Sequence, residues 1–217
     1  MADTKISAMT LMGDGVLADA DEFPVADATA LTSDLAVTAL QLRAYLGTGL
    51  RNANTADVAV AAATSVYLTG SSIAVPVGKL RIGTVFKWSL TFSKTAAGVA
   101  TRQHFLRIGT AGTTADAAII THTSPVPTAV TDQGILEIVA VIRGPLSASC
   151  ILASSWFFAH ATTGSTGLSS VNEVEVQQIT SAAFDATTAN LIVGLSCTTG
   201  ASEVLTYQVV TATAEFL

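Results

Sequence analysis

The chain has 217 residues, of which half are apolar, 6% are aromatic and 12% are charged, and its formal net charge is −6. That charge lies in the first 34 residues, which hold seven acids and one lysine, whereas residues 35–217 hold nine acids and nine bases. A neutral body with an acidic leader lacks the basic face that nucleic-acid binding needs, so no nucleic-acid partner is expected. The sequence contains no unbroken run of ~18 apolar residues, so no membrane span is predicted. The N-terminus has no signal-peptide pattern, which predicts synthesis in the cytoplasm.

Residues 1–31 show no sustained hydrophobic period, and Gly13, Gly15 and Pro24 interrupt any helix. Short apolar pieces are separated by Asp, so this peptide cannot bury a core of its own. We predict an extended docking arm that places apolar side chains in successive pockets of another protein, with a solvated terminus as the alternative. The candidate docking residues are Ile6, Leu17, Phe23, Pro24 and Val25.

Residues 32–50 contain the stretch SDLAVTALQLRAYLG, from Ser33 to Gly47, which predicts one short helix. Ser33 suits an N-cap, and Gly47 suits the left-handed residue that follows a helix. Apolar residues on two seams predict burial on more than one side, because a lone helix this short is marginal in water. The alternatives are an ordinary core helix and a trimerisation helix around a symmetry axis. The trimer contacts would be Leu35, Ala39, Leu42 and Leu46.

Residues 51–65 are polar and then Ala-rich, which predicts a linker, and from Val66 the pattern changes to strands and turns. The candidate strands are Val66–Leu68, Ile73–Val75, Thr84–Ser93, Gln103–Ile108, Ala117–Thr123, Ile135–Ile142, Cys150–Ala159, Val174–Ile179, Leu191–Ser196 and Val204–Ala214. About eight to ten strands without intervening helices predict an antiparallel β-sandwich, jelly-roll-like, over residues 66–217. The fold class is therefore mainly β, with an extended N-terminal arm and one short helix before the sandwich.

Two tryptophans lie in predicted strands. Trp88 shares one face of its strand with Phe86, Leu90 and Phe92, which predicts a core position. Trp156 stands next to Phe157 and Phe158, and one of these three side chains must point outward. Trp156 is therefore the candidate for a surface contact, such as stacking on a sugar.

Few residues suggest chemistry. His104, His122 and His160 lie in or beside strands and lack the spacing of metal ligands, so no metal site is predicted. Glu173 and Glu175 share one strand face, which is compatible with a carboxylate pair and equally with a solvated strand. We predict that the protein is not an enzyme and has no cofactor.

The loop from Gly109 to Asp116 is rich in glycine but lacks the Gly-Lys-Ser/Thr ending of a phosphate cradle. We expect Asp116 to brace this loop through its backbone amides. Cys150 and Cys197 lie in apolar, strand-like runs and are predicted to be buried free thiols. A disulfide is the alternative if their strands are neighbours.

The N-terminal fifty residues resemble the start of many tailed-bacteriophage tail-fibre and virion proteins. The resemblance rests on Lys5-Ile6-Ser7, on the DEFPV segment from Asp21 to Val25, and on the Thr/Ser residues that lead into the predicted helix. In that family the leader anchors the protein to the virion. Many relatives are more basic after the Pro-Val pair, where this chain has Ala26-Asp27-Ala28.

A second resemblance covers most of residues 66–217. The run from Val77 to Ile119 is similar to a β domain that recurs in phage structural proteins, with echoes in Thr131 to Ile138 and Thr180 to Ser196. Together the resemblances imply a structural protein located in the virion and made in the host cytoplasm.

The first functional hypothesis is a homotrimeric tail fibre or spike component. It would dock on other virion proteins by residues 1–31 and present the β domain for host attachment, with a host cell-surface glycan as a candidate partner. The alternative is a capsid decoration protein, a head fibre or cement protein that stabilises the head shell. A more remote alternative is a glycan-cleaving tailspike.

Overall fold

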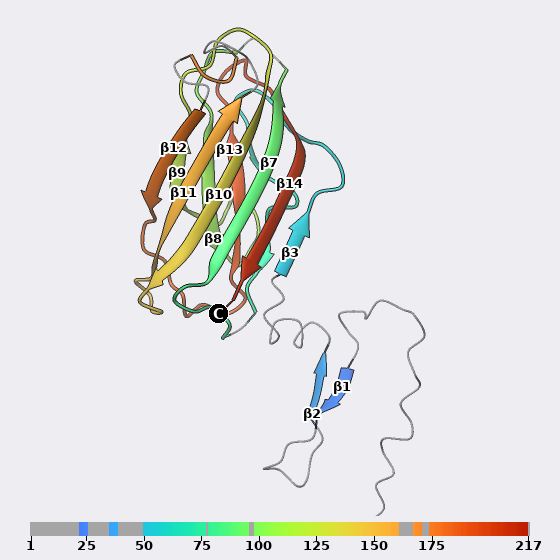
Figure 1. The fold of residues 1–217 in the computed structure, drawn as a ribbon, viewed down its shortest axis with the longest axis vertical. Helices are drawn as coiled ribbons and strands as arrows, with labels where there is room; N and C mark the ends of the chain where they lie inside the picture. Colours follow the sequence, from blue (N-terminus) through green and yellow to red (C-terminus); the bar gives the residue numbers. More distant parts are fainter. Residues whose placement is uncertain are drawn as a thin grey trace, which may run out of the picture. The chain divides into compact units, whose positions relative to one another are not determined.

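The structure is a computed structural model that describes residues 22–25, 35–38, 50–76, 78–95, 98–160, 167–170 and 174–216. The chain divides into two compact units, Met1–Leu46 and Gly47–Leu217. In the first unit the described residues form one antiparallel pair, β1 (Glu22–Val25) with β2 (Leu35–Thr38). The second unit is a sandwich of two antiparallel sheets (Figure 1). None of the described residues is helical, so this part of the chain offers no membrane-spanning helix.

The larger sheet has seven strands in the order β12-β11-β10-β7-β14-β3, with β4 also paired to β14. In chain order they are β3 (Leu50–Ala53), β4 (Val58–Val60), β7 (Val85–Lys94), β10 (Asp132–Gly144), β11 (Ile151–His160), β12 (Val174–Thr180) and β14 (Leu205–Glu215). Figure 1 shows this sheet in front, with β12 at one edge and β3 at the other.

The smaller sheet has five strands in the order β5-β13-β8-β9, with β6 also paired to β13. In chain order they are β5 (Ser65–Tyr67), β6 (Ile73–Ala74), β8 (Gln103–Gly109), β9 (Ala117–Thr123) and β13 (Ile192–Thr198). The chain passes between the sheets several times, for example from β7 to β8 and from β13 to β14. Segments distant in the sequence therefore face each other across the core.

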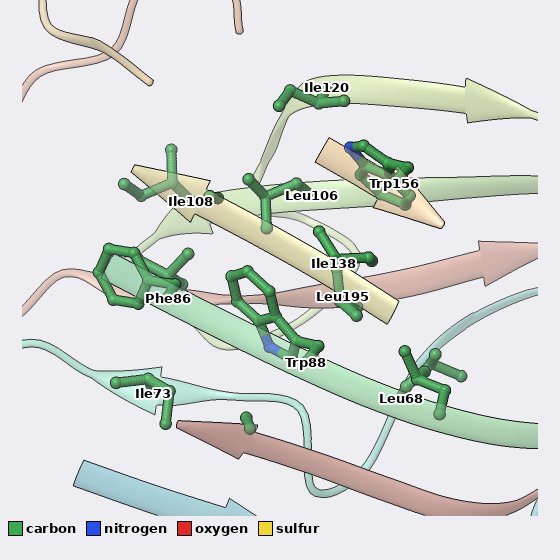
Figure 2. Close-up of a cluster of buried hydrophobic side chains, with 14 of the residues drawn as sticks. Leu68, Ile73, Phe86, Trp88, Leu106, Ile108, Ile120, Ile138, Trp156 and Leu195 are labelled. Atoms are coloured by element: carbon green, nitrogen blue, oxygen red, sulfur yellow. The ribbon is translucent and has the colours of Figure 1, made fainter. Parts of the chain in front are cut away.

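The core forms because side chains alternate along each strand, and both sheets turn their apolar positions inward. In β7 the buried residues alternate with half-buried or exposed ones, and the register with β10 sets Trp88 beside Ile138 and Leu90 beside Leu136. Figure 2 shows Trp88 and Ile138 among side chains from both sheets, including Leu106 and Leu195 of the smaller one. Each of these core side chains is at most 2% exposed.

The predicted antiparallel sandwich is confirmed. The strands predicted from the sequence between residues 66 and 217 agree with those in the structure. Each of the ten candidate strands is present, as β5 to β14, with ends shifted by no more than three residues. The prediction that Trp88 is a core residue is also confirmed. Its indole N–H donates to the carbonyl oxygen of Ser71 at 2.7 Å, so burial leaves no polar atom unpaired.

The predicted linker over residues 51–65 is wrong, because two strands of the larger sheet lie there. β3 pairs Leu50 with Ala214, and β4 pairs Val60 with Leu205. Val60 is completely buried, and Leu50 and Val58 pack against the core. These strands are too short and too interrupted by Ala and polar residues for their alternation to stand out in the sequence.

The predicted helix is wrong over Leu35–Thr38, which forms β2 and not a first helical turn. Val37 and Thr38 are β-branched and favour extended backbone. The antiparallel register that joins Leu35 to Val25 supplies the backbone partners that an isolated helix would lack. Pro24 is tolerated in β1 because a two-stranded ribbon leaves one side of each strand unpaired. The rest of the predicted helix lies outside the described residues.

Two N-terminal truncations should separate the leader from the sandwich. Removing residues 1–46 should leave the unfolding midpoint of the body unchanged. Removing residues 1–60 also deletes β3 and β4, which should cost at least about 3 kcal/mol through lost burial of Leu50, Val58 and Val60. For a domain of this size that loss lowers the midpoint by roughly 6–12 °C in a thermal melt. Equal midpoints for the two truncated proteins would show that residues 51–60 are a dispensable linker after all.

Candidate functional site

Four charged side chains are buried together at one end of the core. Lys94 ends β7, Arg102 precedes β8, Asp132 begins β10 and Glu203 precedes β14. All four are at most 6% exposed. Each occupies an inward position of the strand pattern, since Lys94 follows Phe92 by two residues and Glu203 precedes Leu205 by two. Two positive and two negative charges thus balance within the protein.

Arg102 and Glu203 form an ion pair with both side chains fully buried. Nη1 of Arg102 lies 3.5 Å from Oε1 of Glu203 and also donates to the carbonyl oxygen of Leu168 at 3.0 Å. The guanidinium also lies over the neighbouring rings of Phe92 and Phe158, 5.6 and 5.1 Å from their centroids. Burial raises the pKa of Glu203, and the charge of Arg102 opposes that shift. The pair therefore depends on its own mutual attraction in a site that water does not reach.

Lys94 and Asp132 hold the loops at this end of the sandwich. Nζ of Lys94 donates to the carbonyl oxygens of Thr128 and Val130. Oδ2 of Asp132 accepts from the backbone N–H of Leu168 at 3.0 Å and lies 2.7 Å from Nδ1 of His160. Both charges are thus used to order backbone that belongs to no strand.

His104 belongs to a buried chain of hydrogen-bonding side chains. Its Nε2 lies 2.7 Å from Oη of Tyr207, and the buried thiol of Cys197 interacts electrostatically with the same hydroxyl. Burial lowers the pKa of His104 well below its ordinary value and raises the pKa of Cys197 to about 12. Histidine, thiol and phenol are therefore all neutral near pH 7. Cys150 and Cys197 are both buried and free, which confirms that prediction.

His122 lies flat against Trp156, with ring centroids 5.2 Å apart and an interplanar angle of 1°. Burial, helped by the charge of Arg102, lowers the pKa of His122 to about 4. Oε1 of Glu175 lies 4.0 Å from Nε2 of His122, which is too long for a hydrogen bond and does not hold the proton on the ring. The imidazole is therefore a neutral packing partner of the indole.

The prediction that Trp156 makes a surface contact is wrong. Its side chain is 1% exposed, and its indole N–H donates to Oγ of Ser154 at 2.8 Å. The outward member of the aromatic run is Phe157, which is 38% exposed. The strand register decides this, because Trp156 shares its face with Ser154 and Phe158, which also point inward.

The remaining candidate residues are placed as follows. Asp116 braces its loop as expected, accepting from the N–H groups of Ala111 at 3.0 Å and Gly112 at 2.7 Å. Glu173 lies outside the described residues, so its pairing with Glu175 stays a hypothesis. Among the described residues no three His, Cys, Asp or Glu side chains gather as metal ligands.

The candidate docking and trimerisation residues fall in the first unit. Phe23, Pro24 and Val25 lie in β1, which pairs with β2 of the same chain. Leu35 lies in β2. The other candidates lie outside the described residues: Ile6, Leu17, Ala39, Leu42 and Leu46.

The outer face of the larger sheet carries much of the exposed apolar surface. Six large hydrophobic side chains between 38% and 62% exposed point outward from β10, β11, β12 and β14: Ile135, Val139, Phe157, Val174, Val176 and Val209. The register sets Val176 beside Phe157, and Ile135 beside Ala159. The face also carries charges: Glu137 stands opposite Phe157, Arg143 is exposed on β10, and Lys87 is paired with Glu215 at 2.8 Å. Exposed apolar side chains gathered on one face mark an interaction surface.

A hollow of ≈ 530 Å³ opens on this same face. Its lining comes from β7, β10, β11 and β14 and consists of Thr91, Phe92, Gln133, Gly134, Ile135, Ala159, His160 and Gln208. A shift in the register of β14 between Tyr207 and Val209 adds Gln208 to the outer face, where its amide donates to Oγ of Ser93 at 2.8 Å. The lining of the hollow is mainly apolar, and the amides of Gln133 and Gln208 add polar groups to it.

Sequence reasoning missed the buried charges. The signal was available, because Arg102 has the same strand parity as His104 and Leu106, and Asp132 the same parity as Leu136. The alternation of inward side chains, continued by two residues beyond the last apolar one, would have predicted that these charges are buried.

No family model matches this chain, and no curated protein does. Among solved structures it is similar to one described as "Structure of infectious bursal disease virus Gx strain", with 11% identity and a TM-score of 0.20. The match covers 91% of this chain and 47% of that chain, so this chain spans about half the length of the other. A likeness at this level carries no argument about fold or function.

Replacing Glu203 with Gln should strongly destabilise the sandwich. The change leaves the guanidinium of Arg102 buried without its carboxylate, which costs about 3–5 kcal/mol. Urea unfolding followed by tryptophan fluorescence measures the loss. The double variant Arg102→Met with Glu203→Leu removes both charges and should lose less than the single variant. A single variant as stable as the wild type would show that the pair is dispensable.

Acid should weaken the fold between pH 6.5 and pH 4. An unfolded histidine titrates near 6.5, whereas the pKa of His122 in the fold is about 4. The unfolded chain therefore binds the proton first, so stability is complete above pH 6.5 and falls until about pH 4, by about 3 kcal/mol for this residue. His104 acts in the same direction.

The variant His122→Phe keeps a ring against Trp156 but cannot titrate. Its free energy of unfolding should fall less than that of the wild type between pH 6.5 and pH 4, measured by urea unfolding at each pH. The raised pKa of Glu203 acts in the opposite direction in both proteins and cancels in the comparison. Parallel pH profiles for the two proteins would contradict the assignment of a neutral, buried His122.

Proposed function

We propose that this protein is a structural component of a bacteriophage virion, in the first place a homotrimeric tail fibre or spike component. The observation that carries the proposal is the apolar outer face of the larger sheet. A freely dissolved monomer rarely leaves such a face open to water, whereas a subunit of a larger assembly covers it. The resemblance of the sequence to phage virion proteins supports the same assignment.

The division of the chain supports a role in assembly. The acidic leader and the neutral sandwich belong to separate compact units, so one can attach to a partner while the other folds around its own core. We propose that the leader docks on a basic groove of another virion protein, because its net charge of −6 favours such a surface.

The sandwich would be the part presented outward. Its charged side chains are balanced internally at one end, and its outer face offers apolar surface and the uncharged hollow near Gln133 and Gln208. The ligand we propose is a host cell-surface glycan, because a sugar ring has apolar faces as well as hydroxyl groups. Linked copies would gain avidity from weak single sites without any new contact.

Deleting residues 1–31 tests the docking role of the leader. The truncated protein should keep the far-ultraviolet spectrum, unfolding midpoint and oligomeric state of the full chain, because none of the sandwich strands is touched. It should be absent from particles purified after complementation of a phage that lacks the full-length gene, as measured by immunoblotting. Incorporation of the truncated protein at the normal level would overturn the proposal for the leader.

Labelling of particles that carry the tagged full-length protein locates the subunit. Label on the tail supports the fibre or spike assignment, and label on the head supports decoration of the capsid. Mass photometry of the purified full-length protein should show a defined oligomer, with a trimer expected first. A protein that stays monomeric at micromolar concentrations would contradict self-assembly.

A further inference from the structure

The floor of the hollow on the larger sheet continues into an exposed aromatic ring. The strands that line the hollow, β11, β10, β7 and β14, lie side by side in the sheet (Figure 1). Ile135 of β10 lies directly opposite Ala159 of β11, and Phe157 lies two residues before Ala159 on the same outer face. Ile135 is 43% exposed and Phe157 is 38% exposed. They are diagonal neighbours, about 7–8 Å apart and within reach of an aromatic side chain, so the apolar surface of the hollow extends to Phe157.

Polar side chains border this apolar surface. Gln133 and Glu137 flank Ile135 on β10, two residues before it and two residues after it, so all three point outward. Gln208 of β14 donates one amide N–H to Oγ of Ser93 at 2.8 Å, which leaves its carbonyl oxygen able to accept. Within the described part of the chain, the side chains of Gln133 and Glu137 make no hydrogen bond to the protein. Donors and acceptors are thus available around an apolar floor.

The buried charges described above hold the backbone around the hollow. The carboxylate of Asp132 accepts from the backbone N–H of Gln133 at 2.7 Å. Its Oδ2 lies 2.7 Å from Nδ1 of His160, which also lines the hollow. Lys94 donates to the carbonyl oxygen of Val130, two residues before Asp132. The lining is therefore ordered before any ligand arrives, which lowers the entropic cost of binding.

Charge restricts the kind of ligand that this surface accepts. Among the described residues no lysine or arginine lines the hollow, and His160 in its lining faces the buried carboxylate of Asp132. Glu137 is exposed beside Ile135 and stands opposite Phe157. An acidic ligand would meet this carboxylate without a cation to balance it. A purely apolar ligand would cover Glu137 and the glutamine amides without partners, which costs free energy. The surface therefore favours a neutral ligand that has both apolar faces and hydroxyl groups.

The hollow lies away from β3, the strand of the sandwich that follows the first unit in the chain. Leu50 of β3 pairs with Ala214 near the end of β14. Gln208, in the lining of the hollow, lies six residues earlier on β14, roughly 20 Å along the strand. Within the sandwich, the hollow is thus separated from the segment that connects to the leader.

We propose that the hollow and Phe157 form one binding site for a neutral glycan of at least two linked sugars. One sugar occupies the hollow with an apolar face against Ile135, and the next sugar stacks on the ring of Phe157. Hydroxyl groups of the two sugars bond to Gln133, Gln208 and Glu137. The volume of the hollow, ≈ 530 Å³, lies within the range of about 300–1,000 Å³ that ligand pockets have. The host origin of the glycan rests on the proposed function, whereas binding itself is a property of the purified chain.

Substitution of Phe157 tests the stacking part of the site. The full-length protein would be screened on an array of neutral and acidic bacterial surface polysaccharides, and oligosaccharides from the best neutral binder would be titrated by calorimetry. Phe157→Ala should weaken this binding at least about tenfold, because the ring supplies the stacking surface. Ile82→Ala removes an apolar side chain that is 58% exposed, just before β7 and nine residues from Thr91, and should leave binding unchanged. Equal losses in the two variants, or no binding to any neutral polysaccharide, would overturn the proposal.

Substitution of Glu137 tests the selection against acidic ligands. The wild-type protein should retain neutral polysaccharides at least about tenfold more strongly than acidic ones, because like charges next to each other weaken binding. Glu137→Gln keeps a hydrogen-bonding side chain but removes the charge, so it should raise the retention of acidic polysaccharides. Asp57→Asn removes an exposed charge between β3 and β4 and should leave the ratio unchanged. A wild-type protein that binds acidic polysaccharides as well as neutral ones would contradict the assignment.

Glycan binding and particle assembly are measured separately. Unfolding midpoints of the variants would confirm that each of them is folded. A protein that enters particles but binds no neutral polysaccharide would keep its structural role and lose this site. A protein that binds a neutral polysaccharide through Phe157 but is absent from particles would keep the site and lose the proposed place in the virion.

Discussion

The structure depends on one constraint, that the inner faces of two antiparallel sheets must fill each other's space. Side chains alternate along every long strand, so each strand commits half of its residues to the shared core. Trp88 and Ile138 from the larger sheet meet Leu106 and Leu195 from the smaller one in that layer. Because the chain crosses between the two sheets several times, residues distant in the sequence share this core.

The same alternation carries charges inside at one end. Arg102 and Glu203 keep the inward parity of their strands beyond the last apolar residue, and Lys94 and Asp132 do the same. Their charges are compensated by each other and by backbone groups of the loops that close this end. Buried charges of this kind add little net stability, but they tolerate few other arrangements of the loops. His104 and His122 belong to the same interior, where burial lowers the pKa of both imidazoles.

Several large apolar side chains lie outside the core, on the outer face of the larger sheet. The outward positions of β10, β11 and β12 carry exposed apolar side chains among polar and charged ones such as Glu137 and Gln178. The assembly role proposed above rests on these exposed apolar side chains. The reading of the chain as a subunit of a larger structure therefore comes from its surface, since the interior is complete within one chain.

The secondary structure of short segments with a weak hydrophobic pattern could not be predicted from the sequence alone. The alternation of Val58 and Val60 covers only three residues, and β4 becomes a strand because β14 offers it a partner. Leu35 to Thr38 fits a helical seam and a strand equally well by spacing. The pairing with β1 decides between them, and that pairing is a contact across nine intervening residues.

The sequence by itself determined the fold class and the ten strands from β5 to β14, because long alternating runs and turn residues are local signals. It also determined the neutral body, the acidic leader and the burial of both cysteines. Only the tertiary structure decided which side of a strand faced the core where both sides were apolar. Trp156 was buried and Phe157 exposed by the register of β11 with its neighbours, a choice that depends on partners distant in the chain. The strand order of the larger sheet, which ends at β12 among the described residues, has the same physical reason, since it is fixed by pairing between segments distant in the chain.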